Sequence, residues 1–292
     1  VSITADPASV LTHLCRKQHL RRQIPIEQCP AHHTIAKMAS QEQNMPFIKN
    51  LASSDRKLRT QALTSLQTFL GSHRSLTRLD ALKLWKGLFY AMWMCDRPVP
   101  QQNLAAELAA LTSCLRNDDV PTWLSAFWET MARQWTDIDV LRMEKFLLLV
   151  RRSFASGLQW VKDGAYDDAR ADALLAVYAE YPFELEGDLR KVPVGLRLHG
   201  VDIWVDELER LEMLGGDDEK AVAFARKLSK IVEPLKRSPV KTVRAKVAEA
   251  VEDERLPWTE RKTEEATGET AASAAEGAMD EDDDEWDGID DK

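Results

Sequence analysis

The chain has 292 residues, enough for one large or two small cores, with nine tryptophans and only 7% aromatic residues overall. Its net charge of −9 arises at the C-terminal end, where Glu264 to Lys292 holds 13 acidic residues and one lysine, so the first 263 residues carry +3. No apolar stretch reaches transmembrane length, no apolar signal core begins the sequence, and the four cysteines form no CxxC pair. These features argue against a membrane protein and a disulfide framework, and favour a reducing intracellular compartment.

Residues 1–37, Val1 to Lys37, show no sustained hydrophobic period. We expect a flexible leader, or an upstream extension of the gene model, because Met38 would be an ordinary start. The separation of Cys15 from Cys29, with no second close cysteine pair, does not match a structural zinc site. No metal or cofactor is therefore expected, and the folded domain is predicted to span residues 38–262.

From Pro46 onward, apolar residues recur at spacings of three and four, which predicts consecutive helices. The first carries Leu58 to Leu70, with Ser54 as its cap and Gly71 at its end. The second runs from about Arg78 to Cys95 and is expected to bury one side, made of Leu82, Trp85, Leu88, Phe89, Met92 and Trp93. Gly87 and Ala91 lie on its opposite side and would let another helix approach, which predicts an inner helix of a stack.

Further helices are predicted at about Val99 to Arg116 and at Trp123 to Trp135, with Pro121 in the first turn of the latter. The next is expected to begin at a capping Asp137, and its run Phe146 to Val150 has no polar side. Asp139, Arg142 and Lys145 follow at spacings of three, which indicates ion pairs within the stack or, alternatively, contact with a partner protein.

The second half of the chain continues the pattern. Helices are predicted at about Asp167–Tyr181, Leu196–Leu214, Asp218–Leu235 and Pro239–Val251, with a loop from Phe183 to Val194. Residues 263–292 are too poor in large apolar side chains to repay their ordering entropy, which predicts a disordered acidic tail. About nine helices without a convincing strand predict an all-α protein, a HEAT-like α-solenoid of stacked antiparallel helical hairpins with disordered termini. The sequence period is too irregular to prove a repeat.

Two long runs carry a family resemblance: LWKGLFYAMWMCDRPVPQQNLAAEL, beginning at Leu84, and WTDIDVLRMEKFLLLVRRSF, from Trp135 to Phe154. With a weaker likeness over about Pro46 to Leu256, they resemble the eukaryotic nucleolar ribosomal RNA-processing protein one, or Nop-fifty-two, family. The resemblance implies a HEAT-like, non-catalytic assembly factor of the nucleus and nucleolus, required for pre-rRNA processing in the large-subunit (pre-60S) precursor. It also implies a Brix-domain protein and a WD-repeat protein as partners.

Catalytic motifs are missing: the sequence has no phosphate-loop glycine pattern, no GxGxxG, no HExxH and no GxSxG. His73 and His199 are the only histidines after the leader. Serine, histidine and aspartate can assemble in space without a motif, but nothing in the sequence favours such a site. We therefore expect a binding protein and not an enzyme.

Basic residues concentrate between Arg226 and Lys246, where eight of them accompany one acidic residue, Glu233. Such density suits a phosphate backbone, bound through counterion release and not through base reading. The alternative is a solvated face that balances the acidic tail. The candidate RNA- or partner-binding residues are Arg226, Lys227, Lys230, Lys236, Arg237, Lys241, Arg244 and Lys246, with smaller groups at Arg56, Lys57 and Arg59, at Arg97, and at Arg151 and Arg152.

Two hypotheses follow from these residues and from the resemblance. The first is a scaffold of the pre-ribosomal large-subunit particle that binds other assembly factors and pre-rRNA. The second is a helical-repeat adaptor that binds proteins and makes no RNA contact. Salt-sensitive RNA binding and sedimentation with pre-ribosomal particles would distinguish them.

Overall fold

The structure is a computed structural model that describes residues 50, 53, 55–72, 75–215 and 218–259. Within these residues it contains nine α-helices joined by short turns and 3₁₀ segments, and no strand. The prediction of an all-α fold is thus confirmed. The expected leader (1–37), the expected acidic tail (263–292) and the predicted cap Ser54 lie outside the described residues.

The first three described helices are α4 (Arg56–Ser72), α5 (Arg78–Trp93) and α6 (Pro98–Ala110), which a 3₁₀ turn extends to Cys114. At the start of α5, the hydroxyl of Thr77 accepts a hydrogen bond from the N–H of Asp80 at 3.2 Å, which satisfies one of the free N–H groups of the first turn. In α6, prolines occupy the first turn, where the missing N–H would have no partner.

The central helices are α7 (Val120–Gln134), α8 (Val140–Asp163) and α9 (Asp168–Glu180). The prediction that Asp137 caps α8 is wrong. A 3₁₀ turn at Trp135–Asp137 delays the helix, and Asp139 caps it instead, its carboxylate accepting a hydrogen bond from the N–H of Arg142 at 3.1 Å. The spacing of the apolar residues could not show which of the two aspartates caps the helix, because a single 3₁₀ turn leaves that spacing almost unchanged.

The last helices are α10 (Val194–Arg210), α11 (Glu219–Val232) and α12 (Lys241–Ala250). The sequence predicted one helix from Asp218 to Leu235. The structure has α11 over most of this range and continues it with the 3₁₀ segment η5 (Glu233–Arg237). The end of α10 was predicted too late, at Leu214. The helix stops at Arg210 because Glu212 takes up a left-handed backbone conformation, with φ 56°.

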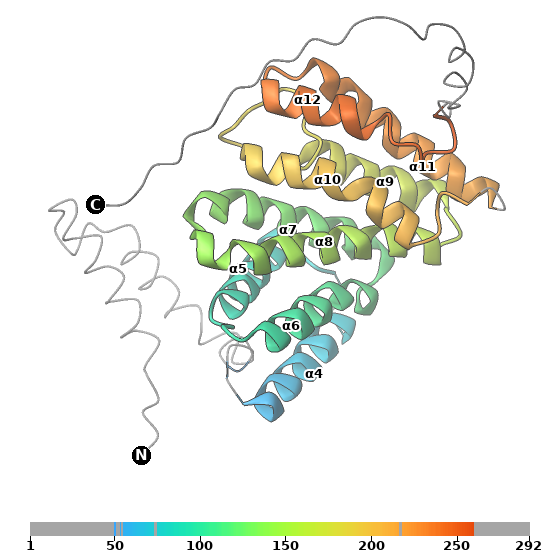
Figure 1. Ribbon diagram of the computed structural model, residues 1–292. Coiled ribbons are helices and arrows are strands. Elements are labelled where there is room, and N and C mark those ends of the chain that lie inside the picture. The colour runs from blue at the N-terminus through green and yellow to red at the C-terminus, as the bar shows by residue number, and fades with distance from the viewer. Residues whose placement is uncertain (1–49, 51–52, 54, 73–74, 216–217, 260–292) are drawn as a thin grey trace, which may run out of the picture. The chain divides into compact units, whose positions relative to one another are not determined.

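Helices two apart in the chain pack side by side, which arranges the stack in two rows. The even row contains α4, α6, α8, α10 and α12, which follow one another along the stack in Figure 1, and the odd row contains α5, α7, α9 and α11. Each inner helix therefore has a neighbour before it and after it in its own row. α5 begins the described odd row and packs on α7, α6 and α8, and it is buried on both of its sides, Gly87 and Ala91 included, as its pattern predicted.

The helices of the even row run parallel, because contacts between neighbours keep the same order along both chains. Along α8 and α10, the ring Nε2 of His199 lies 3.0 Å from the carbonyl of Leu147, and Lys162 donates to the carbonyl of Leu211 at 2.6 Å. The same order of contacts is seen between α6 and α8, in the pairs Cys95–Lys145 and Thr112–Ser156. It is seen again between α10 and α12, in the pairs Asp202–Lys246 and Asp206–Arg255. Each odd helix must therefore carry the chain back, as stacked hairpins require. The HEAT-like classification itself stays a prediction.

The core between α5 and α7 is aromatic. Trp85 is buried, its ring lies 4.6 Å from that of Trp123, and its indole N–H donates to the carbonyl of Trp123 at 3.0 Å. Trp93 departs from the expectation of burial, because it lies in the last turn of α5 and is only partly covered. The guanidinium of Arg142 lies 5.0 Å from the centre of its ring, a cation–π contact that covers part of the indole in addition to the rings of Phe89 and Phe146.

Candidate nucleic-acid interface

The eight basic residues between Arg226 and Lys246 belong to one end of the stack. Three lie on α11, two in η5, and three on α12. They do not form one uninterrupted surface, because the helices turn some of them toward neighbouring elements.

Two of the eight are neutralised across the stack. The ammonium of Lys227 lies 2.7 Å from Asp168 and 3.5 Å from Asp172 at the start of α9. That of Lys246 lies 2.9 Å from Asp202 on α10. The hydrogen bond to Asp168 raises the pKa of Lys227, and the one to Asp202 raises the pKa of Lys246. Both lysines are therefore bound to carboxylates of their own chain, which weakens their case as phosphate ligands.

Two more have structural contacts. Arg244 donates to the carbonyls of Ser238 and Pro239, at 2.7 and 3.0 Å, and thereby fixes the turn before α12. The guanidinium of Arg226 lies 5.0 Å from the centre of the Trp258 ring. Arg226 remains exposed at the surface, so it can still meet a phosphate, whereas replacing Arg244 would disturb the fold.

The remaining four are exposed and make no ion pair with any described residue. We call this set the basic face: Lys230, Lys236, Arg237 and Lys241. The nearby Glu233 accepts a hydrogen bond from the hydroxyl of Ser229 at 2.9 Å, so its carboxylate does not compete for these lysines and arginine by direct contact. Four uncompensated positive charges on consecutive turns can bind phosphates of a nucleic-acid backbone.

The smaller groups of candidates are separated from the basic face. Arg56 begins α4, Lys57 is exposed, and Arg59 donates to the carbonyl of Ser53 at 2.9 Å. Arg97, exposed before α6, also has no ion pair in the part of the chain that the structure describes.

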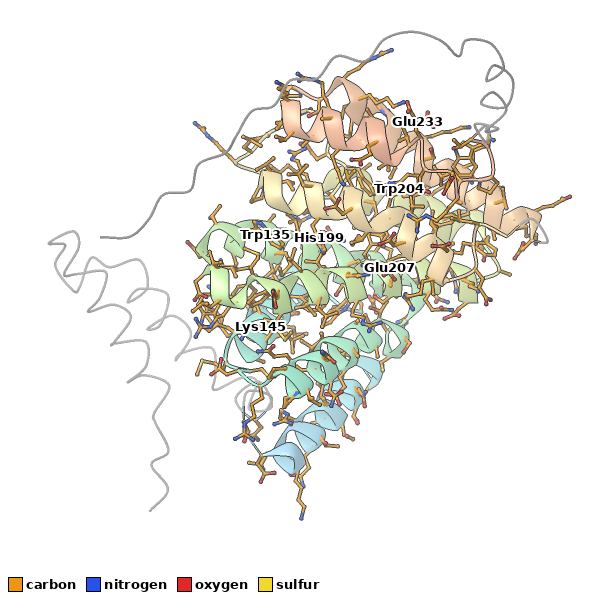
Figure 2. The ribbon with its side chains drawn as sticks, in the orientation of Figure 1. Trp135, Lys145, His199, Trp204, Glu207 and Glu233 are labelled. Atoms are coloured by element: carbon orange, nitrogen blue, oxygen red, sulfur yellow. The ribbon has the colours of Figure 1, made fainter. Side chains whose placement is uncertain are left out.

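The two arginines of α8 have different surroundings. Arg151 contacts Glu207 at 2.5 Å and Asp206 at 3.1 Å, whereas Arg152 is exposed. Glu207 is buried between α8 and α10 and also contacts Arg210, so Arg151 has a structural role in joining two helices (Figure 2).

Lys145, expected in an ion pair or a partner contact, caps a helix. Its ammonium donates to the carbonyls of Trp93 and Cys95, at 2.7 and 2.8 Å, where α5 ends, and Asp96 lies 3.8 Å away. Burial lowers the pKa of Lys145 and also that of His199. Asp139 and Arg142 pair within α8. Lys145 therefore joins α8 to the end of α5, while the Asp139–Arg142 pair is local to the start of α8, and both agree with the interpretation of these charges as contacts within the stack.

One charged group escaped the sequence analysis. Arg197, on α10, is completely buried and pairs with the buried carboxylate of Glu184. It also donates to the carbonyls of Glu184, of Val192 at 3.1 Å and of Asp188 at 3.0 Å. Glu184 in turn accepts hydrogen bonds from the N–H groups of Glu186 and Gly187. The loop before α10 is thus fixed by one arginine.

No sequence signal distinguished Arg197 from the exposed arginines, because it stands in a helix that carries polar residues on both sides. The loop does need a glycine at Gly187, whose φ is 74°, but the sequence shows only the glycine and not this conformation. Among the residues that the structure describes, no group of three or more histidine, cysteine, aspartate or glutamate side chains could hold a metal ion. None of the described helices has the length and apolarity needed to cross a membrane.

Comparison with known families adds to this geometry. A family model described as nucleolar protein, Nop52, matches residues 42–290. The chain belongs to the Nop52 family. The nucleolar family implied by the two runs at Leu84 and Trp135 is thereby confirmed, and Nop52 is not a known enzyme family.

Among Nop52 relatives, the chain is 30% identical to human ribosomal RNA processing protein 1 homolog B over 226 residues, which cover 74% of this chain and 29% of that protein. It is 31% identical to mouse homolog A over 169 residues, 56% of this chain and 34% of that protein. With human homolog A it shares 28% identity over 234 residues, 74% of this chain and 50% of that protein. The chain therefore spans half or less of the length of these relatives.

Proposed function

We propose that this chain is a non-catalytic helical scaffold in ribosomal RNA processing, acting on the precursor of the large ribosomal subunit in the nucleolus. The observation that carries the proposal is membership of the Nop52 family over residues 42–290, with relatives named as ribosomal RNA processing proteins. Helices that stack on their neighbours in two rows suit a scaffold, because they offer a long surface to other molecules.

The basic face is the proposed contact with pre-rRNA. Lys230, Lys236, Arg237 and Lys241 are exposed and unpaired, as phosphate ligands must be before they bind. None of them is interleaved with exposed aromatic rings, so stacking on single-stranded bases contributes little. The binding that this face supports is electrostatic and independent of base sequence.

Replacing these four residues by glutamate tests the RNA contact. Affinity for a ribosomal RNA fragment should fall, and the dependence of log affinity on log salt should flatten by roughly 0.7 to 0.9 for each phosphate that the variant no longer binds. Helical content and thermal unfolding should stay unchanged, since none of the four supports the core. Arg244 is kept, because its replacement would loosen the turn before α12.

A matched control changes the net charge equally at exposed positions that are not candidate phosphate ligands: Arg116, Arg190, Lys191 and Lys220 to glutamate. These side chains lie between α6 and α7, in the loop before α10 and on α11. If both variants lose RNA affinity equally, total charge and not the basic face is responsible. An unchanged affinity and salt slope in the first variant would disprove the RNA contact.

The second candidate function is a protein adaptor without RNA contact. The intramolecular pairing of Lys227, Lys246 and Arg151 favours it, because these three candidate phosphate ligands are already bound to carboxylates within the stack. The resemblance proposes a Brix-domain protein and a WD-repeat protein as partners. Sedimentation with pre-ribosomal particles that survives loss of RNA affinity would support the adaptor.

A further inference from the structure

Charge is separated along the last hairpin of the stack, which consists of α11, η5 and α12. Near its turn, the basic face and Arg244 accompany a single carboxylate of the hairpin, that of Glu233. At its open end, among the described residues, the exposed carboxylates without an ion pair outnumber the one exposed ammonium without one, that of Lys220. They belong to Asp218, Glu219, Glu252 and Glu254. The turn is therefore positive and the open end is negative.

The carboxylates of the open end do not neutralise the turn. Glu219 begins α11, and Lys230 stands eleven residues later in the same helix. At 1.5 Å per residue, this separation is roughly 16 Å. Exposed charges farther apart than about 8 Å are largely screened at physiological salt. The basic face is thus left with its own local charge.

The loop before α10 is the other neighbour of the turn, since a Cβ at Gly187 would meet the ring of Pro239. This loop adds one cation without an ion pair, Arg190, and two carboxylates without one, Glu186 and Asp188, as counted over the described residues. With the loop included, six such cations face three such carboxylates at the turn. The excess of positive charge therefore remains after every neighbouring element is counted.

The described chain ends beside this face. After α12, Arg255 pairs with Asp206 on α10, and Trp258 then lies against Arg226 on α11. Arg226 stands four residues before Lys230, which places both on the same side of α11. The residues that follow Thr259 therefore begin about one helical turn from the basic face.

The sequence beyond Thr259 carries the opposite charge. Glu264 to Lys292 holds 13 acidic residues and one lysine, and Asp280 to Glu285 are six acidic residues in succession. An extended chain advances about 3.3 Å per residue, and each strand of DNA carries one phosphate per about 3.4 Å. An extended run of carboxylates thus has nearly the linear charge density of a nucleic-acid strand.

The length of chain is sufficient for this run to reach the face. Residues 260–279 separate it from Thr259, and a segment of that length reaches up to about 66 Å when extended. The helical span from Arg226 to Arg237 is only roughly 16 Å. A segment tethered in this way acts at an effective concentration on the order of mM, so a weak electrostatic contact suffices.

We propose that the acidic tail (263–292) binds the basic face of its own chain, where its carboxylates take the place of RNA phosphates. The competition with RNA rests on the RNA contact proposed above, whereas the contact between tail and face does not. If the tail occupies the face nine-tenths of the time, the apparent affinity for RNA is about tenfold lower than that of the free face. Weakly bound RNA is then displaced first.

The contact is tested on the full chain with a water-soluble carbodiimide, which joins a lysine amine directly to a carboxylate that touches it. Cross-linked peptides should join Lys230, Lys236 or Lys241 to residues 264–291, and about 1 M salt should abolish them, because the Debye length falls to about 3 Å. Lys220 is the matched control, since it is exposed on the same helix but follows Asp218 and Glu219.

Three results of this experiment would overturn the proposal. The first is an equal yield of cross-links at Lys220, and the second is no yield at the three lysines of the face. The third is a mixture of isotopically heavy and light chains in which the cross-links join heavy to light, because the tail would then bind a second molecule.

The competition is tested in a full-chain variant whose six acidic residues from Asp280 to Glu285 are replaced by their amides. Its affinity for a ribosomal RNA fragment should rise about tenfold. The dependence of log affinity on log salt should steepen, because RNA no longer exchanges with the tail and releases more counterions. A control variant replaces by amides six exposed carboxylates that have no ion pair among the described residues: Glu107, Glu144, Asp163, Glu212, Glu252 and Glu254.

The outcomes distinguish this proposal from the RNA contact. If both variants gain RNA affinity equally, total charge is responsible, and if neither gains while the original chain binds RNA through the basic face, the tail does not compete. Either result overturns the proposed competition and leaves the RNA contact in place. If no variant binds RNA but the cross-links join tail and face, the RNA contact is wrong and the face serves to hold the tail.

Discussion

At the scale of single residues, the most consequential side chain is Arg197. It lies buried on α10 and pairs with the buried Glu184. Arg197 donates hydrogen bonds to backbone carbonyls of the loop before α10, and Glu184 accepts hydrogen bonds from backbone N–H groups of the same loop. Removing one partner of such a pair leaves an uncompensated charge in a medium that solvates it poorly. We expect Arg197→Met to lower the free energy of unfolding by about 3–5 kcal/mol, measured by chemical denaturation.

The control is Arg133→Met, which removes an arginine that pairs with Glu129 from an exposed position on α7. Glu129 is buried, but Arg78 still neutralises it, so the loss of Arg133 should cost no more than the loss of an exposed pair, about 0–1 kcal/mol. Equal costs for the two variants would show that the loop does not depend on the buried arginine.

His199 predicts a pH dependence. Burial lowers the pKa of this imidazole below its ordinary value of 6.5, and the positive charge of Arg151 acts in the same direction. The hydrogen bond to the carbonyl of Leu147 and the negative charge of Asp202 raise the pKa, but they do not cancel the effect of burial. The unfolded chain therefore takes up a proton at a higher pH than the folded chain does. Stability should fall as the pH drops from 7 through 6.5 and continue to fall until the folded histidine is also protonated. Above pH 7 this contribution is constant.

His199→Gln keeps a donor for the carbonyl of Leu147 and removes the titration. The unfolding free energy of this variant should depend less on pH between 7 and 5 than that of the original chain. If the two dependences coincide, the carboxylates alone produce the acid sensitivity.

At the scale of elements, glycine marks where two helices touch. A Cβ at Gly157 of α8 would lie 2.5 Å from the hydroxyl of Tyr178 and 2.8 Å from Leu174 on α9, both far closer than van der Waals contact. We expect Gly157→Ala to destabilise the protein by about 1–3 kcal/mol through overpacking, against the gain of up to ~1 kcal/mol in helix propensity.

Gly71→Ala serves as the comparison, because a Cβ there would lie 3.8 Å from the carbonyl of Cys114 in ordinary contact. That change should leave stability unchanged or raise it by a few tenths of a kcal/mol. Thermal unfolding of both variants decides the matter, and a stabilising Gly157→Ala would mean that α8 and α9 are farther apart than the structure places them.

Sequence periodicity located most helices to within a few residues, because burial of one face repeats along the helix and is local information. Two predictions were wrong for local reasons. The cap of α8 was assigned to Asp137 because the sequence does not reveal the 3₁₀ turn before Asp139. Trp93 was expected to be buried, but it lies in the last turn of α5, where few neighbours cover it. Periodicity could not have paired Lys227 with Asp168, 59 positions away, since spacing carries no information on which helix becomes a neighbour. For the same reason the predicted basic segment was larger than the face that remains unpaired.

At the scale of the whole described stack, disturbance should stay local. Leu228 of α11 and Leu66 of α4 are both completely buried, near opposite ends of the stack. Each change to alanine should cost about 2–5 kcal/mol. In a row where helices touch only their neighbours, Leu228→Ala should speed amide hydrogen exchange in α9 to α12, and Leu66→Ala in α4 to α6. Equal acceleration everywhere in both variants would indicate a single cooperative core instead.

The two-row arrangement also bears on how the chain can be made. Hydrogen bonds between successive layers of a row join residues mostly 43 to 59 positions apart. One bond reaches further, from Arg78 on α5 to Tyr181 directly after α9, 103 positions along the chain. Among the described helices, the main packing joins near neighbours and does not require the last helix to meet the first. A chain leaving the ribosome can therefore complete each layer once about two more helices have emerged, and its aromatic surfaces are covered in the order of their synthesis.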